Sequence, residues 1–298
     1  AKASMIIKQL NRAIPKKYLF NLAAVIAIGA TAALAVRDLI YTPPTPMCAE
    51  RYGHPTLFGL QRPDGSLLGA GDLQARLGGR DWGVLENAQI TKLKQGPAAV
   101  ALRVALPHKA VQPGDRSGTT SGLGFTWLPA KLAGATSACL GYNVFLPDGF
   151  EFGAGGALPG LFGGPDLADR DPKKVSAFSS RMRWRDDGAA EVRVRSQLDQ
   201  GGRSYAVDPN WTKLPRGEWV HIEQEIVLNS PGKEDGILRV WINRELKLEE
   251  TMMAFAPDAK TRLGGVIADV HYADTGLGWI AAPKHTSLWL TEFELRSK

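Results

Sequence analysis

The stretch FSSRMRWRDDGAAEVRVR, residues 178–195, is the part of the sequence that most directly indicates the fold. Arginines alternate with apolar or small side chains in its first half, FSSRMRWR, and again in its last part, EVRVR. Successive side chains of a strand point to opposite faces of a sheet, so this alternation predicts two strands. Asp186, Asp187 and Gly188 form a turn signal between them, and we expect the strands to pair as a hairpin.

This hairpin would gather basic side chains on one face of a sheet. The face would carry Arg181, Arg183, Arg185, Arg193 and Arg195. Like charges crowded in this way cost stability unless an anionic group lies over them, which favours a binding site for an anion. A basic row is also common on an ordinary solvated sheet surface, and the sequence leaves both interpretations open.

Short alternating segments recur through the rest of the chain and predict an all-β domain. We expect strands over residues 101–106, 137–147, 218–230, 236–250 and 285–297, and a glycine-rich loop from Phe152 onward. No segment after residue 40 has a long helical period. These observations together predict an antiparallel two-sheet sandwich of the jelly-roll type.

The amino-terminal segment has a different composition. Residues 1–17 form a basic flank, and the nineteen residues 18–36 carry no charge. A helix of that length measures roughly 28 Å, so we expect a transmembrane helix over residues 18–40. Because more cations precede this helix than follow it, the amino terminus is predicted to be cytoplasmic and the remaining chain periplasmic, at a bacterial inner membrane. A cleaved signal peptide ending at Ala33, Leu34 and Ala35 is the alternative.

The segment YTPPTPM, residues 41–47, reads as an extended proline-rich linker, and residues 48–298 as the periplasmic domain. The chain contains two cysteines, Cys48 and Cys139, and both fall in the predicted periplasmic part. We expect them to form a disulfide, with two buried thiols as the alternative. Two cysteines and five scattered histidines predict no metal site, and nothing in the sequence indicates a cofactor.

The net charge of +6 does not indicate nucleic-acid binding. Residues 1–41 hold six basic side chains and one acidic side chain, which leaves the rest of the chain close to neutral. The excess charge therefore belongs to the predicted membrane flank, and no nucleic-acid partner is expected.

Five motifs between Cys139 and Leu295 follow one another along the chain, namely YNVFLPDGFEF, GGALPGLFGG, FSSRMRWRDDGAAEV, EWVHIEQEIVLNSPGKEDGILRVWIN and GGVIADVHYADTGLGWIAAPKHTSLWLTEF. In their order, spacing and chemistry they resemble polysaccharide lyase family fourteen. The family cleaves alginate and glucuronan and has a β-jelly-roll fold. The resemblance thus implies the same fold, and Ser179 and Arg181 match a family Ser-x-Arg motif that would hold the glycan.

The residues that the resemblance would assign to catalysis are replaced in this chain. Ala157 stands where the family has a lysine, and Arg193 and Arg195 stand where it has two tyrosines. Arginine, with a pKa above about 12, cannot exchange protons near neutral pH, although it can bind a carboxylate. Tyr205, His221, His271 or Tyr272 could take over such a role, and ordinary structural roles for them are the alternative.

The sequence therefore predicts a membrane-anchored lyase-like jelly roll that has lost lyase chemistry. Two functions follow. The domain could bind an acidic polysaccharide through Ser179, Arg181, Arg183, Arg193 and Arg195, or it could serve as an accessory subunit of a respiratory, photosynthetic or secretory membrane complex, with the lipid bilayer as a further partner. An active uronate lyase with rearranged catalytic residues is the alternative.

Overall fold

A computed structural model describes residues 16–40, 45–77, 81–132, 134–164, 178–197, 199, 201–208, 210, 212–274, 276 and 278–298. Side chains in the first of these ranges are described at Tyr18 and over residues 20–32. The chain divides into two compact units, Ala1–Thr45 and Pro46–Lys298.

The first unit contains one described helix, α2 (Lys16–Ile40). No helix in the described ranges combines the length and the apolar character that a membrane crossing requires. The prediction of a transmembrane helix over residues 18–40 is therefore unsupported. The predictions that depended on it, namely an inner-membrane anchor, a bilayer partner and a role in a membrane complex, lose that support as well.

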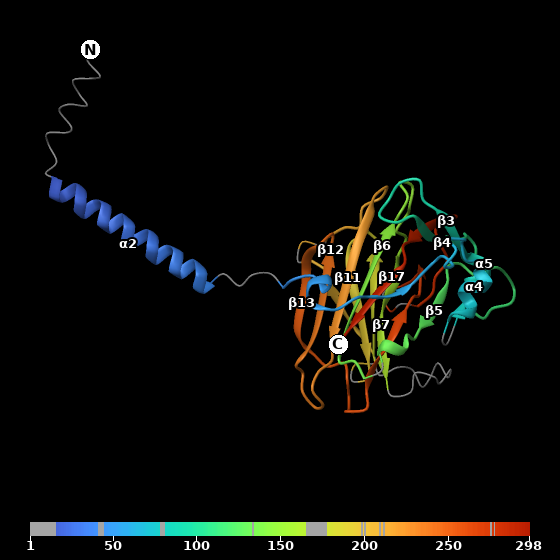
Figure 1. Ribbon diagram of the computed structural model, residues 1–298. Coiled ribbons are helices and arrows are strands. Elements are labelled where there is room, and N and C mark those ends of the chain that lie inside the picture. The colour runs from blue at the N-terminus through green and yellow to red at the C-terminus, as the bar shows by residue number, and fades with distance from the viewer. Residues whose placement is uncertain are drawn as a thin grey trace, which may run out of the picture. The chain divides into compact units, whose positions relative to one another are not determined.

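The second unit is an all-β sandwich of two antiparallel sheets, as the sequence predicted (Figure 1). In the nine-stranded sheet the main path runs β13, β12, β11, β6, β16, β4 and β3, while β17 joins β1 to β6. The bounds are β1 (Thr56–Phe58), β3 (Ala88–Lys92), β4 (Val100–Leu106), β6 (Ser137–Phe145), β11 (Trp219–Val227), β12 (Gly236–Ile242), β13 (Glu245–Met253), β16 (Thr286–Leu290) and β17 (Phe293–Ser297).

The eight-stranded sheet runs β10, β9, β8, β7, β14, β5 and β2, with β15 paired to β7. Its strands are β2 (Asp81–Trp82), β5 (Gly124–Trp127), β7 (Gly155–Gly164), β8 (Phe178–Arg185), β9 (Ala190–Ser196), β10 (Arg203–Ala206), β14 (Arg262–Ile267) and β15 (His271–Tyr272). Short helices complete the described fold, namely α3 (Cys48–Arg51), α4 (Ala70–Ala75), α5 (Val84–Asn87) and the 3-10 turn η1 (Ala130–Leu132).

One hydrophobic core fills the space between the two sheets. It takes Val144 and Ile222 from the nine-stranded sheet and Met182 and Trp184 from the eight-stranded sheet, all almost fully buried. The alternate residues of the same strands face outward. Each sheet therefore presents an outer face on which function can be carried without disturbing the core.

The prediction of a glycine-rich loop after Phe152 was wrong, because residues 155–164 form the central strand β7, which is buried along its whole length. The glycines of this strand allow its neighbours to approach closely. A Cβ atom at Gly156 would lie 1.9 Å from the Trp184 ring, and one at Gly160 would lie 1.9 Å from the carbonyl oxygen of Ser180. The glycine content thus reflects close packing between strands rather than a turn.

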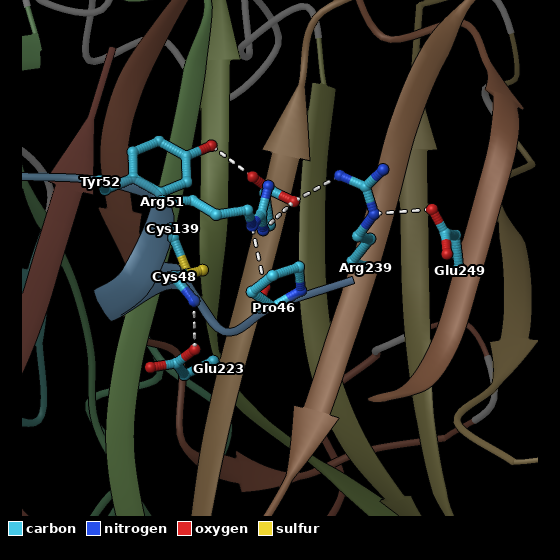
Figure 2. A network of polar contacts seen from close by, with 9 residues as sticks. Pro46, Cys48, Arg51, Tyr52, Cys139, Glu223, Arg239 and Glu249 are labelled. Atoms are coloured by element: carbon cyan, nitrogen blue, oxygen red, sulfur yellow. Dashed lines mark hydrogen bonds and ion pairs between the residues drawn. A yellow bond between two sulfur atoms is a disulfide. The ribbon is translucent and has the colours of Figure 1, made fainter. Parts of the chain in front are cut away.

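The predicted disulfide between Cys48 and Cys139 is confirmed. It fixes residues 46–52, which we call the strap and which include α3, onto the outer face of the nine-stranded sheet, because Cys139 is a residue of β6. Figure 2 shows that the strap also contacts Glu223 of the neighbouring strand β11. Arg51 of the strap donates to Glu225 of the same strand. The Cys48 amide donates a 3.0 Å hydrogen bond to Glu223 Oε2.

Candidate functional site: an arginine face on the eight-stranded sheet

The predicted hairpin is formed by β8 and β9. Arg181 pairs with Arg193, and Ser179 pairs with Arg195, so these four side chains share the outer face of the sheet. On the other side of the same strands, Met182 and Trp184 are fully buried in the core. We call the outer surface formed by Ser179, Arg181, Arg183, Arg185, Arg193 and Arg195 the arginine face.

Two carboxylates that the sequence analysis did not assign to the site lie on this face. Arg181 Nη1 lies 2.7 Å from Asp269 Oδ2, and Arg183 Nε lies 3.1 Å from Glu191 Oε1. Arg185 Nη1 is 3.8 Å from the other oxygen of Glu191. These pairs fix the inner guanidinium groups in place, with the Arg183 side chain only 2% exposed.

The environment of Arg183 affects its titration. Burial lowers the pKa of the Arg183 guanidinium below its ordinary value, and Glu191 opposes this effect. The neighbouring cations Arg193 and Arg185 lower that pKa further. Asp274 opposes the shift as Glu191 does, and burial is the main reason that the pKa is lowered.

The outer two arginines have fewer anionic neighbours. Arg193 donates to the carbonyl oxygen of Gly201 at 2.6 Å and to Ser204 Oγ at 3.3 Å. Arg195 is exposed. In the described part of the chain, neither residue forms an ion pair with a carboxylate. Ser179 is almost fully buried beside Arg195, with 5% of its surface exposed.

His271 lies on the same face, at the position where the sequence analysis noted the missing lysine. It pairs directly with Ala157, which in turn pairs with Arg183 on the next strand. The His271 ring meets Trp82 edge to face at 5.6 Å between ring centroids. Its Nδ1 lies 2.8 Å from the Tyr272 carbonyl oxygen, and the residue is 4% exposed. His271 is therefore buried and held by Trp82 and the backbone, two strands away from Arg183.

The other residues considered for proton transfer lie elsewhere. Tyr205 pairs with Val192, whose side chain faces the core, and Tyr272 is buried with its hydroxyl donating to the Glu151 carbonyl oxygen. His221 belongs to β11 of the opposite sheet. Burial raises the pKa of both tyrosines. Of the four candidates, only His271 shares a surface with the arginines.

One group of side chains has the composition of a metal site. Cys48, Cys139 and Glu223 place their ligand atoms within 4.8 Å of one another. The two sulfur atoms are joined in the disulfide, and disulfide sulfur lacks the thiolate charge with which cysteine binds metals. This cluster therefore serves to hold the strap in place.

Comparison with known proteins identifies a family model and solved structures that resemble this chain. The model of the family described as Polysaccharide lyase 14 matches residues 94–293. The alginate lyase from Aplysia kurodai superposes with a TM-score of 0.59 and 20% identity, over 74% of this chain and 90% of that chain. The alginate lyase vAL-1 from Chlorella virus gives a TM-score of 0.59 at 16% identity, over 74% of this chain and 92% of that chain.

A mutant of alginate lyase Aly36B in complex with an alginate trisaccharide gives a TM-score of 0.58 at 19% identity, and the match covers 83% of this chain and 99% of that chain. A search of curated proteins finds no significant match. At these identities the superpositions establish a shared fold, while the residues of the arginine face must be interpreted from their own chemistry.

Proposed function

The chain belongs to the polysaccharide lyase 14 family, and from this premise we propose that its jelly-roll domain binds an acidic polysaccharide on the arginine face without cleaving it. The observation that carries the proposal is the placement of Arg193 and Arg195, which form no ion pair with a carboxylate among the described residues. Asp269 pairs with Arg181, and Glu191 pairs with Arg183 and Arg185. A polyanion could pair with the Arg193 and Arg195 guanidinium groups, and related structures of the same fold are alginate lyases.

The ion pairs on the face suit it to hold a carboxylate. Because Asp269 fixes Arg181 and Glu191 fixes Arg183, their guanidinium groups lose little conformational entropy when a ligand binds. Arg193 and Arg195 form no ion pair with a carboxylate among the described residues and would supply the charge-assisted hydrogen bonds, which arginine makes in pairs to a carboxylate. Ser179 stands beside Arg195 and could bind a sugar hydroxyl.

The proposal excludes cleavage by the groups that the family resemblance implies. Elimination across a uronate requires a base that removes the C5 proton and an acid that protonates the leaving oxygen. Ala157 has no titratable group, and arginine, the residue type at positions 193 and 195, does not act as a general base or acid in proteins. The arginines can stabilise an anion, but they cannot transfer its protons.

A specific observation favours an active lyase as the second candidate. His271 pairs with Ala157, which lies between it and Arg183, so an imidazole stands next to the place of the missing lysine. Histidine can take up and release protons near neutral pH. In this alternative His271 would act as the base and Arg181 would neutralise the uronate carboxylate.

The disulfide bears on where the domain works. A bond between Cys48 and Cys139 persists in an oxidising compartment, which supports our proposal of a periplasmic location for residues 48–298. Residues 41–47 are then proposed to act as a linker ahead of this domain.

Binding can be tested by affinity electrophoresis of the full chain in gels containing sodium alginate or polyglucuronate. The double variant Arg193→Ala with Arg195→Ala should migrate without retardation, while the wild type is retarded. The control Lys233→Ala with Arg244→Ala removes the same charge from turns beside the nine-stranded sheet and should behave as wild type. Equal retardation of both double variants would contradict the proposal.

The lyase alternative is tested on the same polymers by the ultraviolet absorbance of the unsaturated uronate that elimination produces. We expect no increase for the wild type. A sustained increase that His271→Ala abolishes would replace the binding proposal with the enzymatic one.

A further inference from the structure

A row of aromatic and polar side chains crosses the outer face of the nine-stranded sheet, on the opposite side of the sandwich from the arginine face. Trp219 of β11 pairs with Phe145 of β6, and Phe145 pairs with Trp289 of β16. Trp289 pairs with Arg103 of β4, which pairs with Gln89 of β3. We call these five residues the transverse row.

Neighbouring side chains of the row are in contact. The ring centroids of Phe145 lie 5.3 Å from those of Trp219 and 5.8 Å from those of Trp289. The Arg103 guanidinium lies 6.0 Å from the Trp289 ring centroid and donates a 3.4 Å hydrogen bond to Gln89. With strands about 4.8 Å apart, the row extends over about 19 Å.

The position of these rings is unusual for a sandwich. Alternation places Val144, Val220 and Leu288 in the core, so Phe145, Trp219 and Trp289 point outward, where they are half-buried. Outer sheet positions are ordinarily polar. Three adjacent aromatic side chains on such a face form an apolar patch, which in soluble proteins commonly marks an interaction site.

The patch is hollowed rather than flat. A pocket of about 320 Å³ is lined by the three rings together with Leu93, Gln95 and Gly96. Gly96 allows the β3–β4 turn to lie over the Trp219 indole, since a Cβ atom there would come within 2.8 Å of Nε1. The volume lies within the range of small-ligand pockets, which is about 300–1,000 Å³.

Two groups of the row offer polar contacts to a ligand. Among the described residues, Trp219 Nε1 has no hydrogen-bond acceptor, and Arg103 forms no ion pair with a carboxylate. Lys94, which lies between the lining residues Leu93 and Gln95 in the sequence, adds an exposed cation to the half-buried Arg103. An occupant of this groove should therefore present an apolar face to the rings and an anionic group to Arg103.

We propose that the transverse row is a second polysaccharide-binding site, on which the sugar rings of an acidic glycan stack against Trp219, Phe145 and Trp289 while a carboxylate meets Arg103. A pyranose ring presents C–H groups on one face and hydroxyls at its rim. It fits a surface of aromatic faces with hydrogen-bonding groups beside them. The choice of an acidic polysaccharide as the ligand rests on the proposed function.

A polar row lies one step along the same strands and would receive the hydroxyls. His221 pairs with Asn143, and His221 Nδ1 lies 3.2 Å from Asn143 Oδ1. Asn143 Nδ2 donates to Thr291 Oγ1 at 3.2 Å. Because these contacts fix the three side chains, they form a prearranged polar edge along the aromatic groove.

The test measures the affinity of the full chain for sodium alginate oligosaccharides by titration calorimetry, at low and at high salt. The double variant Trp219→Ala with Trp289→Ala should weaken binding about tenfold, and this loss should persist in high salt because stacking is not screened. Replacing the same residues by Phe keeps a ring at each position and should restore most of the affinity. The variant Leu57→Ala removes an exposed side chain from another strand and serves as control.

The same titrations on Arg193→Ala with Arg195→Ala separate this inference from the proposed function. If the tryptophan variants bind as wild type while the arginine variants do not, the arginine face is the site and the transverse row is not. If only the tryptophan variants lose affinity, the transverse row stands and the arginine face falls. A wild type that binds no alginate overturns the inference, as does a Phe variant as weak as the Ala variant.

Discussion

The two outer faces of the sandwich use arginine in opposite ways. On the nine-stranded sheet, the Glu225 carboxylate is fully buried and lies 2.8 Å from both Arg51 and Arg239. Figure 2 labels the two arginines. Glu249 balances the second of these arginines, again at 2.8 Å. Two arginines therefore pair with two carboxylates of the same chain, and their charges balance.

On the arginine face, by contrast, Arg193 and Arg195 form no ion pair with a carboxylate among the described residues, and Arg195 is exposed. In the Glu225 cluster, the strap supplies Arg51 and Tyr52 as partners of the carboxylate. The contrast supports a stabilising role for the Glu225 cluster and our proposal that Arg193 and Arg195 bind an external anion.

The largest expected effect comes from removing the disulfide of the strap. Replacing Cys48 and Cys139 together by Ser should lower the free energy of unfolding by about 4–5 kcal/mol, because the bond closes a loop with a sequence separation of 91 residues. Urea unfolding followed by tryptophan fluorescence measures this change. Wild type unfolded in a reducing agent is the matched control. A loss below 1 kcal/mol would mean that the polar contacts alone hold the strap.

The next effect comes from the Glu225 carboxylate itself. Glu225→Gln should destabilise the fold by about 3 kcal/mol, because Arg51 and Arg239 would lose the buried partner that they share. Glu249→Gln is the control, since its partly exposed carboxylate contributes less than about 1 kcal/mol. Equal losses of unfolding free energy in Glu225→Gln and Glu249→Gln would contradict the view that the buried carboxylate contributes more than the partly exposed one.

The contribution of the Glu225 carboxylate to stability should also depend on pH. Burial alone would raise the pKa of Glu225, but hydrogen bonds from Arg51, Tyr52 and Arg239 outweigh it and lower the pKa below 4.5. A lowered native pKa contributes stability that is fully present above pH 4.5 and is lost as the pH falls through the native value. Urea unfolding between pH 3 and 6 should therefore show a steeper decline below pH 4.5 for wild type than for Glu225→Gln. Parallel curves would contradict this origin of the stability.

Sequence patterns predicted the structural features that depend on residues close together in the chain. Alternation was sufficient to predict the hairpin of β8 and β9 and to place Arg181 and Arg193 on one face. With only two cysteines in the chain, the disulfide pairing had one solution. The glycines of β7 were misinterpreted because close strand packing and a flexible loop require the same residue type.

The charge partners were not predictable in the same way. Asp269 lies 88 residues from Arg181, and Glu225 lies 174 residues from Arg51, so no local pattern connects either pair. Strand register decides these contacts, and register depends on the whole sheet. The transverse row was missed for this reason too, since its five residues come from five strands of which only β3 and β4 are consecutive along the chain.

The smallest stability effect, and the sharpest contrast with Glu225, is expected at Arg195. Arg195→Ala should change the free energy of unfolding by no more than about 0.5 kcal/mol, because the side chain is exposed and removing it relieves repulsion from neighbouring cations. The same variant should reduce alginate retention in affinity electrophoresis. A loss of stability comparable to that of Glu225→Gln, with retention unchanged, would mean that the arginine face is built for folding. A stable variant with weakened retention would instead indicate that the positive charge of this face is kept for a ligand, since the fold itself gains nothing from it.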